Sequence, residues 1–422
     1  MIRAFAAAAM LWSMSATHAA EQGDPTAGVP LGQISFSLSR SGDCMSDGPQ
    51  YEVEVRGDGT ATYTGHTGAD VLGTHRYVVP VKGIERLVDL WRTHRLWLSA
   101  EKYVAKVSHG QTVVVTVSAG EQTQRIEEFA GSWIGMPWTI EEFQKSIDAA
   151  AQTVRWTQLS IEAIDRLTDE GFAFGTPEGG AMLWRAIANV ETRDNDASDR
   201  AIVRLLQRGA PIDHDGPPDI ARFRGRLLEI ALYSGRGGTA DALIAGGALK
   251  TGGKPDRGKV DAAFVAALRG GRYAPVLRVW SAAGARKPSL TYIDTRCEGA
   301  QPVPAALNVS MGDDALKIVQ WLVTRGATLD GTDDNGRTLL HHAAAAGDVA
   351  LARYLIERGA DVSAPNRAGE PPLAEVDDED MAMLLIDAGT DLSRLANDAK
   401  DFHQKALIGR WWRVIERLQI PR

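Results

Sequence analysis

The chain has 422 residues, of which 44% are hydrophobic and 24% are charged. This is the composition of a globular protein that buries a core, and the length leaves room for two to four domains. The formal net charge of −8 argues against nucleic-acid binding through overall charge, and beyond the first residues no apolar run reaches the roughly 18 residues of a membrane-spanning helix. We therefore expect no nucleic-acid partner and no stable membrane insertion.

The first residues have the pattern of a secretory signal peptide. Arg3 supplies a short basic region, an apolar run covers residues 4–14, and Thr17-His18-Ala19 offers small residues to a signal peptidase. We predict a signal peptide over residues 1–19, cleaved after Ala19, and a linker with Gly and Pro over residues 20–32. The Ala-, Gly- and Arg-rich composition favours a bacterial source. The mature protein is therefore expected in the periplasm or secreted.

Residues 33–152 are predicted to form an α+β domain with an antiparallel sheet and two helices. Apolar and polar residues alternate in short runs, and Gly57-Asp58-Gly59 is a hairpin turn signal. The first helix is indicated by apolar residues at helical spacing over 84–91. The second helix is expected at 137–152, and the strands at 34–38, 51–55, 60–64, 77–79, 113–117 and 125–129.

This stretch resembles an uncharacterised family of bacterial exported domains. The resemblance rests on Cys44, Pro49 and Tyr51, followed by Gly57-Asp58-Gly59, whereas Gly48 stands where the family has a second cysteine. A local disulfide is therefore not available. The only other cysteine, Cys297, lies in a different predicted domain, so a bridge between the two is a minor alternative. The resemblance implies no particular activity.

From about residue 158 the pattern is helical and repetitive. The clearest copy is NGRTLLHHAAAAGDVALARYLIERGADVSA at 335–364, and weaker copies of its tail occur at 205–213, 243–250, 280–287, 321–330 and 384–393. The spacings between their glycines are 38, 37, 42, 33 and 30 residues, for glycines 209, 247, 284, 326, 359 and 389. A period near 33 with two helices per unit indicates a stacked repeat array.

The clearest copy resembles an ankyrin repeat. Thr338-Leu339-Leu340-His341 takes the place of that family's Thr-Pro-Leu-His, Gly347-Asp348 follows in register, and Asp333-Asp334-Asn335-Gly336 supplies the preceding β-turn. The resemblance implies an all-α, ankyrin-like solenoid over 158–422 that binds a protein partner. Caps are expected at 160–171 and 402–418, because end units must cover their apolar faces. Other first helices are expected at 183–190, 228–233, 264–268 and 305–309, and second helices at 202–206, 240–244, 274–279 and 316–322.

Two clusters in the repeats suggest metal or nucleotide chemistry. His341 and His342 lack the nearby acids or cysteines that would complete a zinc site. The resemblance instead gives His341 a structural role, in which it hydrogen-bonds the backbone of a turn. The segment Gly235-Arg236-Gly237-Gly238-Thr239 lacks the strand and the Gly-Lys-Ser/Thr ending of a phosphate loop. We therefore expect no metal and no cofactor.

Three further clusters are charged or aromatic. The acidic run from Glu375 to Asp380 is expected to be a solvated turn and helix N-terminus, with partner docking as the alternative, and its short repeat predicts a curtailed first helix. The basic aromatic terminal helix is expected to be a cap with half-buried tryptophans, with a membrane-surface or partner site as the alternative. Trp133, Met136, Pro137 and Trp138 are expected to pack in the core, with a ligand groove as the alternative.

The combined pattern predicts a non-enzymatic periplasmic protein that binds a protein partner through its repeats. The candidate partner-binding residues are Asp334, Asn335, Arg367, Trp411 and Trp412. The alternative is a hydrolase or modifying enzyme with its site in the first domain, where Asp47, Tyr51, His66 and His75 are candidates and the repeats recruit substrate. No G-x-S-x-G nucleophile elbow occurs. An inhibitor or immunity-type protein would differ from the first hypothesis only in what the partner does.

Overall fold

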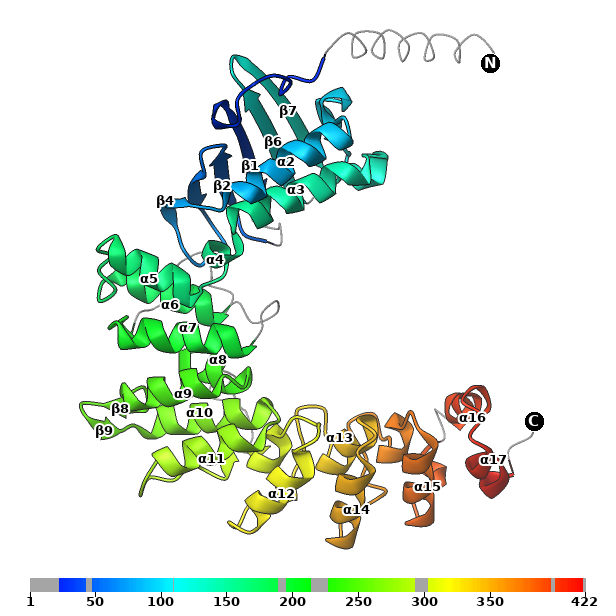
Figure 1. Ribbon diagram of the computed structural model, residues 1–422. Helices are drawn as coiled ribbons and strands as arrows, with labels where there is room; N and C mark the ends of the chain where they lie inside the picture. Colours follow the sequence, from blue (N-terminus) through cyan, green and yellow to red (C-terminus); the bar gives the residue numbers. More distant parts are fainter. Residues whose placement is uncertain are drawn as a thin grey trace, which may run out of the picture. The chain divides into compact units, whose positions relative to one another are not determined.

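The computed structural model describes residues 23–42, 48–108, 110–188, 195–213, 227–292, 303–395 and 399–419 (Figure 1). The predicted signal peptide, Cys44, Asp47 and Cys297 lie outside the described residues. The chain divides into two compact units, Met1–Phe223 and Arg224–Arg422. The first unit holds a sheet domain and the first repeat helices, and the second holds the remaining repeats.

The described residues of the sheet domain form seven strands in the order β4-β3-β2-β1-β6-β7-β5. The central strand β1 pairs antiparallel with β2 and β6, so that Leu38 lies between Val53 and Val115. Buried residues alternate along these strands because only one face of the sheet meets the core. The strands are β1 (Ile34–Gly42), β2 (Tyr51–Arg56), β3 (Thr60–Gly65), β4 (Gly73–Val78), β5 (Lys102–Val104), β6 (Gln111–Ala119) and β7 (Gln122–Phe129).

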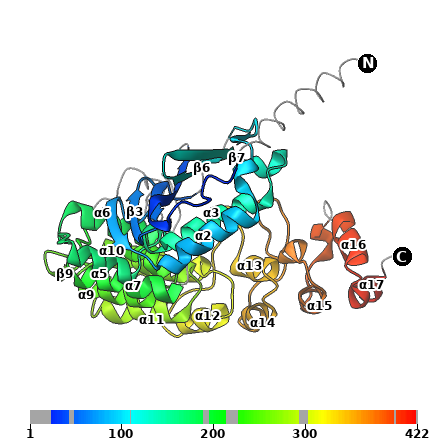
Figure 2. The same cartoon turned by 45° about the horizontal axis from the view of Figure 1, so that its top comes forward.

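Two helices cover one face of this sheet (Figures 1 and 2). In α2 (Val81–Thr93) and α3 (Trp138–Ala151) the apolar residues recur at helical spacing and are buried. Phe143 of α3 meets Phe36 of β1 and Trp91 of α2, with ring centroids 5.8 and 5.7 Å apart. The α+β class and both helices are therefore as the sequence predicted. Short 3-10 turns lie at η1 (Leu31–Gln33), η2 (Leu96–Leu98) and η3 (Gly131–Ile134).

The sheet is larger than predicted and is not wholly antiparallel. The unexpected strand β5 pairs in parallel with the end of β7, so that Val104 is opposite Phe129. With three residues, β5 is too short for an alternating pattern to reveal it. The strand expected at 77–79 begins earlier, as β4.

The sheet domain continues without a gap into the first repeat helices. Helix α4 (Val154–Thr157) places Trp156, which is fully buried, against His75 and Tyr63 of the sheet, at ring-centroid distances of 4.7 and 5.9 Å. After α5 (Ile161–Asp169), the carboxylate of Glu170 lies 2.9 Å from Nδ1 of His75. Asp70 accepts a hydrogen bond from the Leu159 N–H at 2.6 Å. The repeats therefore begin on a surface that the sheet domain provides.

The repeats are pairs of antiparallel elements, as predicted. Within the second unit, the first helices at 227–233 and 257–269 contact each other, and the second helices at 237–245, 273–282, 315–323, 349–357 and 379–387 contact one another in turn, which is the packing of a solenoid. The pairs are α6 (Pro177–Ala188) with α7 (Asn195–Gln207), α8 (Leu227–Tyr233) with α9 (Gly237–Ala245), α10 (Arg257–Arg269) with α11 (Tyr273–Ala282), η5 (Ala305–Asn308) with α12 (Ala315–Val323), α13 (Leu339–Ala345) with α14 (Val349–Glu357), and η6 (Pro372–Glu375) with α15 (Glu379–Asp387).

The glycines that revealed the period all serve one conformational purpose. Glycines 209, 247, 284, 326, 359 and 389 each follow a second helix and have φ between +57° and +95°. This left-handed region is strained for residues with a Cβ and ends a helix readily. Between repeats the described chain forms two small antiparallel strand pairs, β8 (Lys250–Thr251) with β9 (Lys254–Pro255) and β10 (Thr291–Tyr292) with β11 (Val303–Pro304).

Three predicted elements differ in detail. The first elements expected at 305–309 and before the acidic run are single 3-10 turns, η5 and η6; for η6 this is the curtailment that the short repeat predicted. The C-terminal cap is a helix pair rather than one helix, α16 (Ala399–Ile408) and α17 (Trp412–Leu418), preceded by the turn η7 (Leu392–Leu395). Arg410, at φ +55°, makes the turn between the two helices.

Candidate protein-binding surface of the repeats

Two neighbouring repeats begin with turns of the same construction. In the first, Asp333 Oδ1 accepts hydrogen bonds from the N–H groups of Asn335 (2.8 Å) and Arg337 (2.9 Å). In the second, Asn366 Oδ1 accepts from Ala368 (2.9 Å) and Glu370 (3.0 Å). A short polar side chain that holds its own following backbone fixes such a turn. The two turns are therefore rigid copies of each other.

A backbone hydrogen bond joins these turns into a ladder. The Arg367 N–H donates to the Asn335 carbonyl at 2.9 Å. Gly336 lies at the crossing point with φ +73°, and a Cβ there would stand 2.9 Å from the Arg367 nitrogen. Only glycine combines this conformation with so close an approach. We call the segments 333–337 and 366–370 together the turn ladder.

His341 anchors the turn ladder to the helices. Its side chain is fully buried, and Nδ1 accepts a hydrogen bond from the Thr338 N–H at 3.1 Å. Nε2 lies 3.2 Å from the Glu370 carbonyl of the next turn, to which it donates. Burial lowers the pKa of His341, so the neutral ring with its proton on Nε2 satisfies both contacts. These contacts confirm the structural role implied for His341.

The tips of the turn ladder are open to solvent. Asp334, Asn335 and Arg367 are exposed, while the side chains beside them, Asp333 and Asn366, are used to hold the turns. His342 lies 3.1 Å from Asp333, and burial lowers its pKa as well. Three of the predicted partner-binding residues, Asp334, Asn335 and Arg367, therefore lie on one surface. Their side chains make none of the described contacts that hold the turns.

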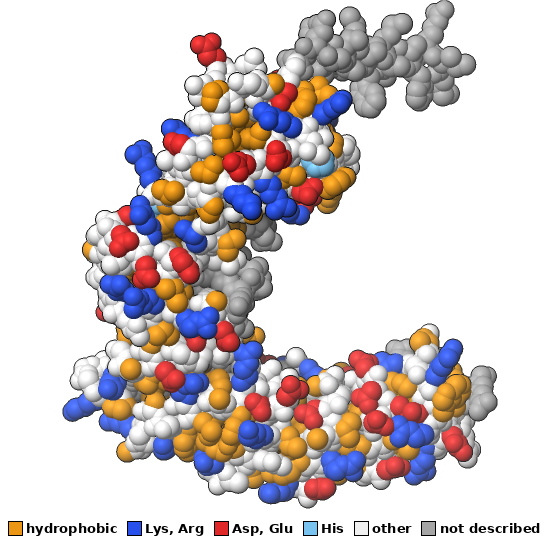
Figure 3. Space-filling model, viewed as in Figure 1, with side chains coloured by type: hydrophobic (Ala, Val, Ile, Leu, Met, Phe, Trp, Pro, Cys, Tyr) orange, Lys and Arg blue, Asp and Glu red, His pale blue; other side chains and the backbone are white. Residues whose placement is uncertain are grey.

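The acidic run and the basic terminal helices pair with each other. Lys405 on α16 lies 2.7 Å from Asp377, and the Arg413 backbone N–H donates to Glu379 at 2.6 Å. The Arg413 side chain also reaches Glu379 and Asp380, and Asp378 caps α15 by accepting from the Met381 N–H at 2.8 Å. Acidic and basic side chains lie next to each other at this end of the chain (Figure 3). These charges are therefore used to seat the cap.

The two tryptophans of the cap have opposite positions. Trp411 is 6% exposed and packs edge-on against Phe402 at a centroid distance of 6.0 Å. Trp412, the next residue, is 55% exposed. A buried ring cannot contact a partner, so Trp411 is removed from the predicted binding residues and Trp412 is kept. The predicted half-buried state therefore matches neither tryptophan, since one ring is buried and the other is exposed.

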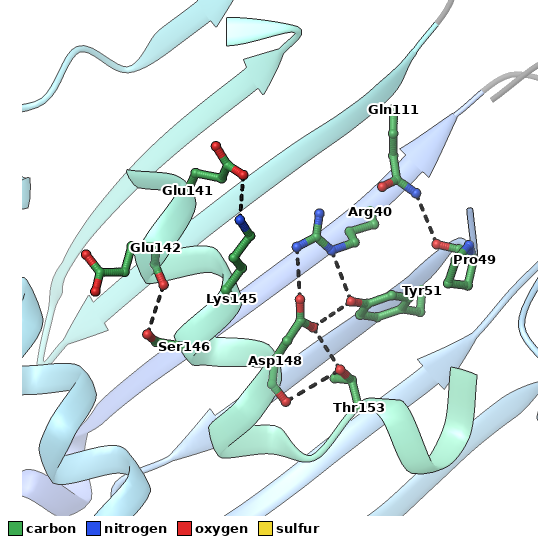
Figure 4. A network of polar contacts seen from close by, with 10 residues as sticks. All are labelled: Arg40, Pro49, Tyr51, Gln111, Glu141, Glu142, Lys145, Ser146, Asp148 and Thr153. Carbon is green, nitrogen blue, oxygen red and sulfur yellow. Dashed lines mark hydrogen bonds and ion pairs between the residues drawn. The ribbon is translucent and has the colours of Figure 1, made fainter. Parts of the chain in front are cut away.

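Tyr51, the first enzyme candidate, belongs to a closed polar network (Figure 4). Its hydroxyl donates to Asp148 Oδ1 at 2.5 Å and accepts from Arg40 at 3.0 Å, while Arg40 also holds Asp148 at 2.9 Å. Thr153 donates to the same carboxylate at 2.9 Å. Burial and the adjacent Asp148 raise the pKa of Tyr51, so it stays protonated at neutral pH. The network ties α3 to β1 and β2.

The other enzyme candidates in the described residues, His66 and His75, have different surroundings. His75 stacks on Trp156 and contacts Glu170 and the Leu72 carbonyl, whereas His66 is exposed. A surface hollow of about 460 Å³ lies between α9 and α11. Tyr51, His66 and His75 do not line it. In the described part of the chain, no group of three or more His, Cys, Asp or Glu side chains could hold a metal ion.

Two features of the surface were missed or misjudged from the sequence. The turn at 366–370 repeats the turn at 333–337 after 33 residues, and this spacing could have revealed the ladder. The aromatic cluster near residue 135 was expected in the core, but Trp133 is 77% exposed and Trp138 is 68% exposed. That expectation was wrong, because both residues lie where η3 turns back into α3 and project away from the helix face that meets the sheet.

Comparison with known proteins finds a family model in each of two parts of the chain. A model of a domain of unknown function (DUF6438) matches residues 34–151, and a model of ankyrin repeats (3 copies) matches residues 299–396. Protein phosphatase 1 regulatory subunit 27 of mouse is 35% identical over 88 residues, which is 21% of this chain and 57% of the relative. The human counterpart is 36% identical over 86 residues, which is 20% of this chain and 56% of the relative.

Two other similarities are more limited. An ankyrin repeat protein of Acanthamoeba polyphaga mimivirus is 33% identical over 72 residues, which is 17% of this chain and 10% of the viral protein. The crystal structure of the human ASB11 ankyrin repeat domain aligns with a TM-score of 0.36 and 18% identity, covering 50% of this chain and 84% of that chain. The chain thus spans little more than half of the two regulatory subunits and a tenth of the viral protein. It carries a DUF6438 domain in its N-terminal part and ankyrin repeats in its C-terminal part.

Proposed function

We propose that the protein is an exported, periplasmic binding protein without catalytic activity, and that its turn ladder holds a folded protein partner. The observation that carries the proposal is the construction of the ladder. Two rigid turns, joined by the Arg367–Asn335 backbone bond, hold the exposed Asp334, Asn335 and Arg367 at fixed spacing. Because the backbone of the turns is already ordered, it loses little conformational freedom on binding.

The charges on the ladder suit a polar protein surface. Asp334 and Arg367 offer opposite charges from adjacent turns, and both remain exposed. Such a pair selects a partner with the complementary order of charges and affects the association rate more than the total affinity. The mouse and human relatives are both named as regulatory subunits of protein phosphatase 1. A binding role for this chain is consistent with those names.

The absence of catalysis is supported by the way the candidate residues are used. Tyr51 is locked in its network with Arg40 and Asp148, and His75 is held between Trp156 and Glu170. A general base must reach the proton that it abstracts. These side chains instead fasten helices to the sheet.

Affinity capture with a charge-reversed ladder tests the binding role. The chain from Ala20 to Arg422 is used to capture proteins from periplasmic extract, in parallel with an Asp334→Arg, Arg367→Glu variant. Arg353→Glu is the matched control, because Arg353 is an exposed arginine on α14 of the same repeat. We expect one or a few proteins to be lost from the ladder variant and kept by the control. Equal capture by all three proteins would contradict the proposed surface.

Export is tested separately by the N-terminus of the mature protein. The proposal rests on the basic, apolar and small-residue pattern of residues 1–19. We expect the protein in the periplasmic fraction with Ala20 as its first residue. Recovery in the cytoplasmic fraction with residues 1–19 intact would refute export and leave the binding test unaffected.

A further inference from the structure

The sheet domain carries an exposed apolar tip that the proposed function does not use. Trp133 and Ile134 of η3 are 77% and 52% exposed, Trp138 at the start of α3 is 68% exposed, and Val104 on β5 is 49% exposed. Strand β5 contacts η3, so these side chains share one end of the domain. We call these four residues the tryptophan tip. Large apolar side chains gathered in this way mark an interaction site.

The backbone holds the tip outward. Ala130 and Gly135, on either side of η3, both have positive φ, so the chain reverses sharply and lifts Trp133 and Ile134 from the surface. Gly131 anchors the turn from below, since a Cβ there would lie 2.9 Å from Met136 Sδ and 3.1 Å from the Tyr103 Cβ. Ala130 adopts a left-handed conformation that is strained for a residue with a Cβ, and position 131 has no room for a Cβ. These two constraints in so short a turn indicate that the fold itself maintains the projecting shape.

The size of the tip does not suit a stable protein interface. An exposed aromatic side chain offers about 150–250 Å², so the four side chains together expose on the order of 500 Å². A stable protein complex needs about 800 Å² from each partner. A projecting group of side chains of this size can instead insert into a lipid bilayer, which needs no complementary pocket. Tryptophan in particular is enriched at the boundary between lipid headgroups and acyl chains.

The charges around the tip balance each other. Arg95, just after α2, and Lys106, just after β5, are exposed, and so are the carboxylates of Glu101 and Glu142. Glu127 and Glu141 pair with Arg125 and Lys145, each at 2.7 Å, and Glu128 accepts from the Gly131 N–H at 3.1 Å. Charge therefore gives no preference for an anionic surface, and the apolar side chains supply the attraction.

The N-terminal segment joins the domain at the same end of α2. Arg92 donates to Asp24 at 3.2 Å and to the Thr26 carbonyl at 2.8 Å. His94, two residues further on, packs edge-on against Trp138 at a centroid distance of 6.0 Å. The described N-terminal segment therefore lies at the end of α2 from which His94 contacts Trp138.

We propose that the tryptophan tip inserts into the headgroup region of a phospholipid bilayer and holds the protein peripherally at a membrane surface. No helix in the described ranges is long and apolar enough to cross a bilayer, so attachment would be through the interface alone. The repeats would then present the turn ladder from a membrane-bound protein. This inference does not depend on the identity of the protein partner.

Co-sedimentation with vesicles tests the proposal on the chain from Ala20 to Arg422. The vesicles contain phosphatidylcholine alone or also phosphatidylglycerol. We expect wild type to bind both kinds of vesicle, with a blue shift of tryptophan fluorescence. The Trp133→Ala, Trp138→Ala variant is expected to bind both at least about tenfold more weakly, because binding strength follows the buried apolar area.

Tyr233→Ala is the control, since Tyr233 on α8 is also an exposed aromatic residue but lies outside the tip. It is expected to bind vesicles as wild type does. Unchanged thermal unfolding of the double variant shows that its fold is intact, because both substituted rings are largely outside the core. The proposal is overturned if wild type binds neither vesicle, or if the double variant binds equally. It is also overturned if wild type forms a dimer that the double substitution abolishes, since the tip would then be a protein interface.

Discussion

His341 connects three parts of one repeat through a single ring. It accepts from the Thr338 N–H, donates to the Glu370 carbonyl and is fully buried. Replacing it with alanine leaves both backbone groups unsatisfied in the core, at a cost of about 1–3 kcal/mol for each. We expect His341→Ala to lower the free energy of unfolding of the second unit by about 2–5 kcal/mol. Urea denaturation followed by circular dichroism measures this loss. A loss below about 0.5 kcal/mol, which is typical of a surface site, would contradict the structural role.

The same histidine makes the repeats sensitive to acid. Burial holds the pKa of His341 below the value of about 6.5 found in an unfolded chain. The unfolded state therefore takes up a proton before the folded state does, and stability present above about pH 6.5 is lost as the pH falls towards the lowered folded pKa. We expect the urea midpoint of wild type to drop between pH 7.5 and 5.5. In His341→Ala the drop should be smaller, with His342 as the remaining contributor. An equal drop in both proteins would show that other groups cause it.

At the scale of elements, the turn ladder can be tested with two glycines. Gly336 and Gly359 both have positive φ, +73° and +88°, but only Gly336 faces another backbone; around Gly359 a Cβ would meet nothing within 4 Å. Gly359→Ala should therefore cost only the conformational penalty of about 1–2 kcal/mol. Gly336→Ala must in addition separate the two turns, so we expect a clearly larger loss. Thermal unfolding of the two variants compares them, and equal losses would mean that the turns do not support each other.

The cap offers an electrostatic test at the same scale. Arg413 on α17 contacts Glu379 and Asp380 at the start of α15, and Lys405 on α16 contacts Asp377. These groups are well exposed, so salt screens them strongly. We expect the Lys405→Ala, Arg413→Ala variant to exchange the amides of 412–418 faster than wild type, and added salt to bring wild type close to the variant. Unchanged exchange in α17 would indicate that its apolar residues alone hold the cap.

The elements that the sequence predicts well are those in which a local pattern decides the structure. The period and its glycines mark the repeats, because a helix end needs the same left-handed residue each time. Pairing between distant segments has no such local mark. Glu379 was expected at a helix N-terminus and Arg413 within one terminal helix, but their contact depends on the break between α16 and α17 and on the stacking of α15 and α17. The exposed Trp133 was misplaced because aromatic residues are usually buried, and nothing local shows that η3 projects.

At the scale of the whole molecule, the boundary between the sheet domain and the repeats differs from its appearance in the sequence. The α+β prediction ends at residue 152 and the family match at residue 151, so residues 153–157 look like a connection. The structure puts Trp156 there, fully buried against His75, Tyr63 and Tyr77. Burial raises the pKa of Tyr77 to about 12, and its hydroxyl donates to the Ala151 carbonyl at 2.6 Å. A segment between two domains is thus part of the core of the first.

Trp156→Ala should therefore weaken the sheet domain and the first repeat helices together. Removing a buried tryptophan costs about 3–5 kcal/mol, and its loss would also free His75 from one side and so loosen the His75–Glu170 contact after α5. Hydrogen exchange is expected to quicken both in β3 and in α5. Trp321→Ala is the control, because Trp321 packs on Trp280 within the second unit; it should quicken exchange in α11 and α12 and leave β3 as it is. If Trp156→Ala affects α5 but not β3, the ring belongs to the repeats alone, and the sheet domain does not serve as their N-terminal support.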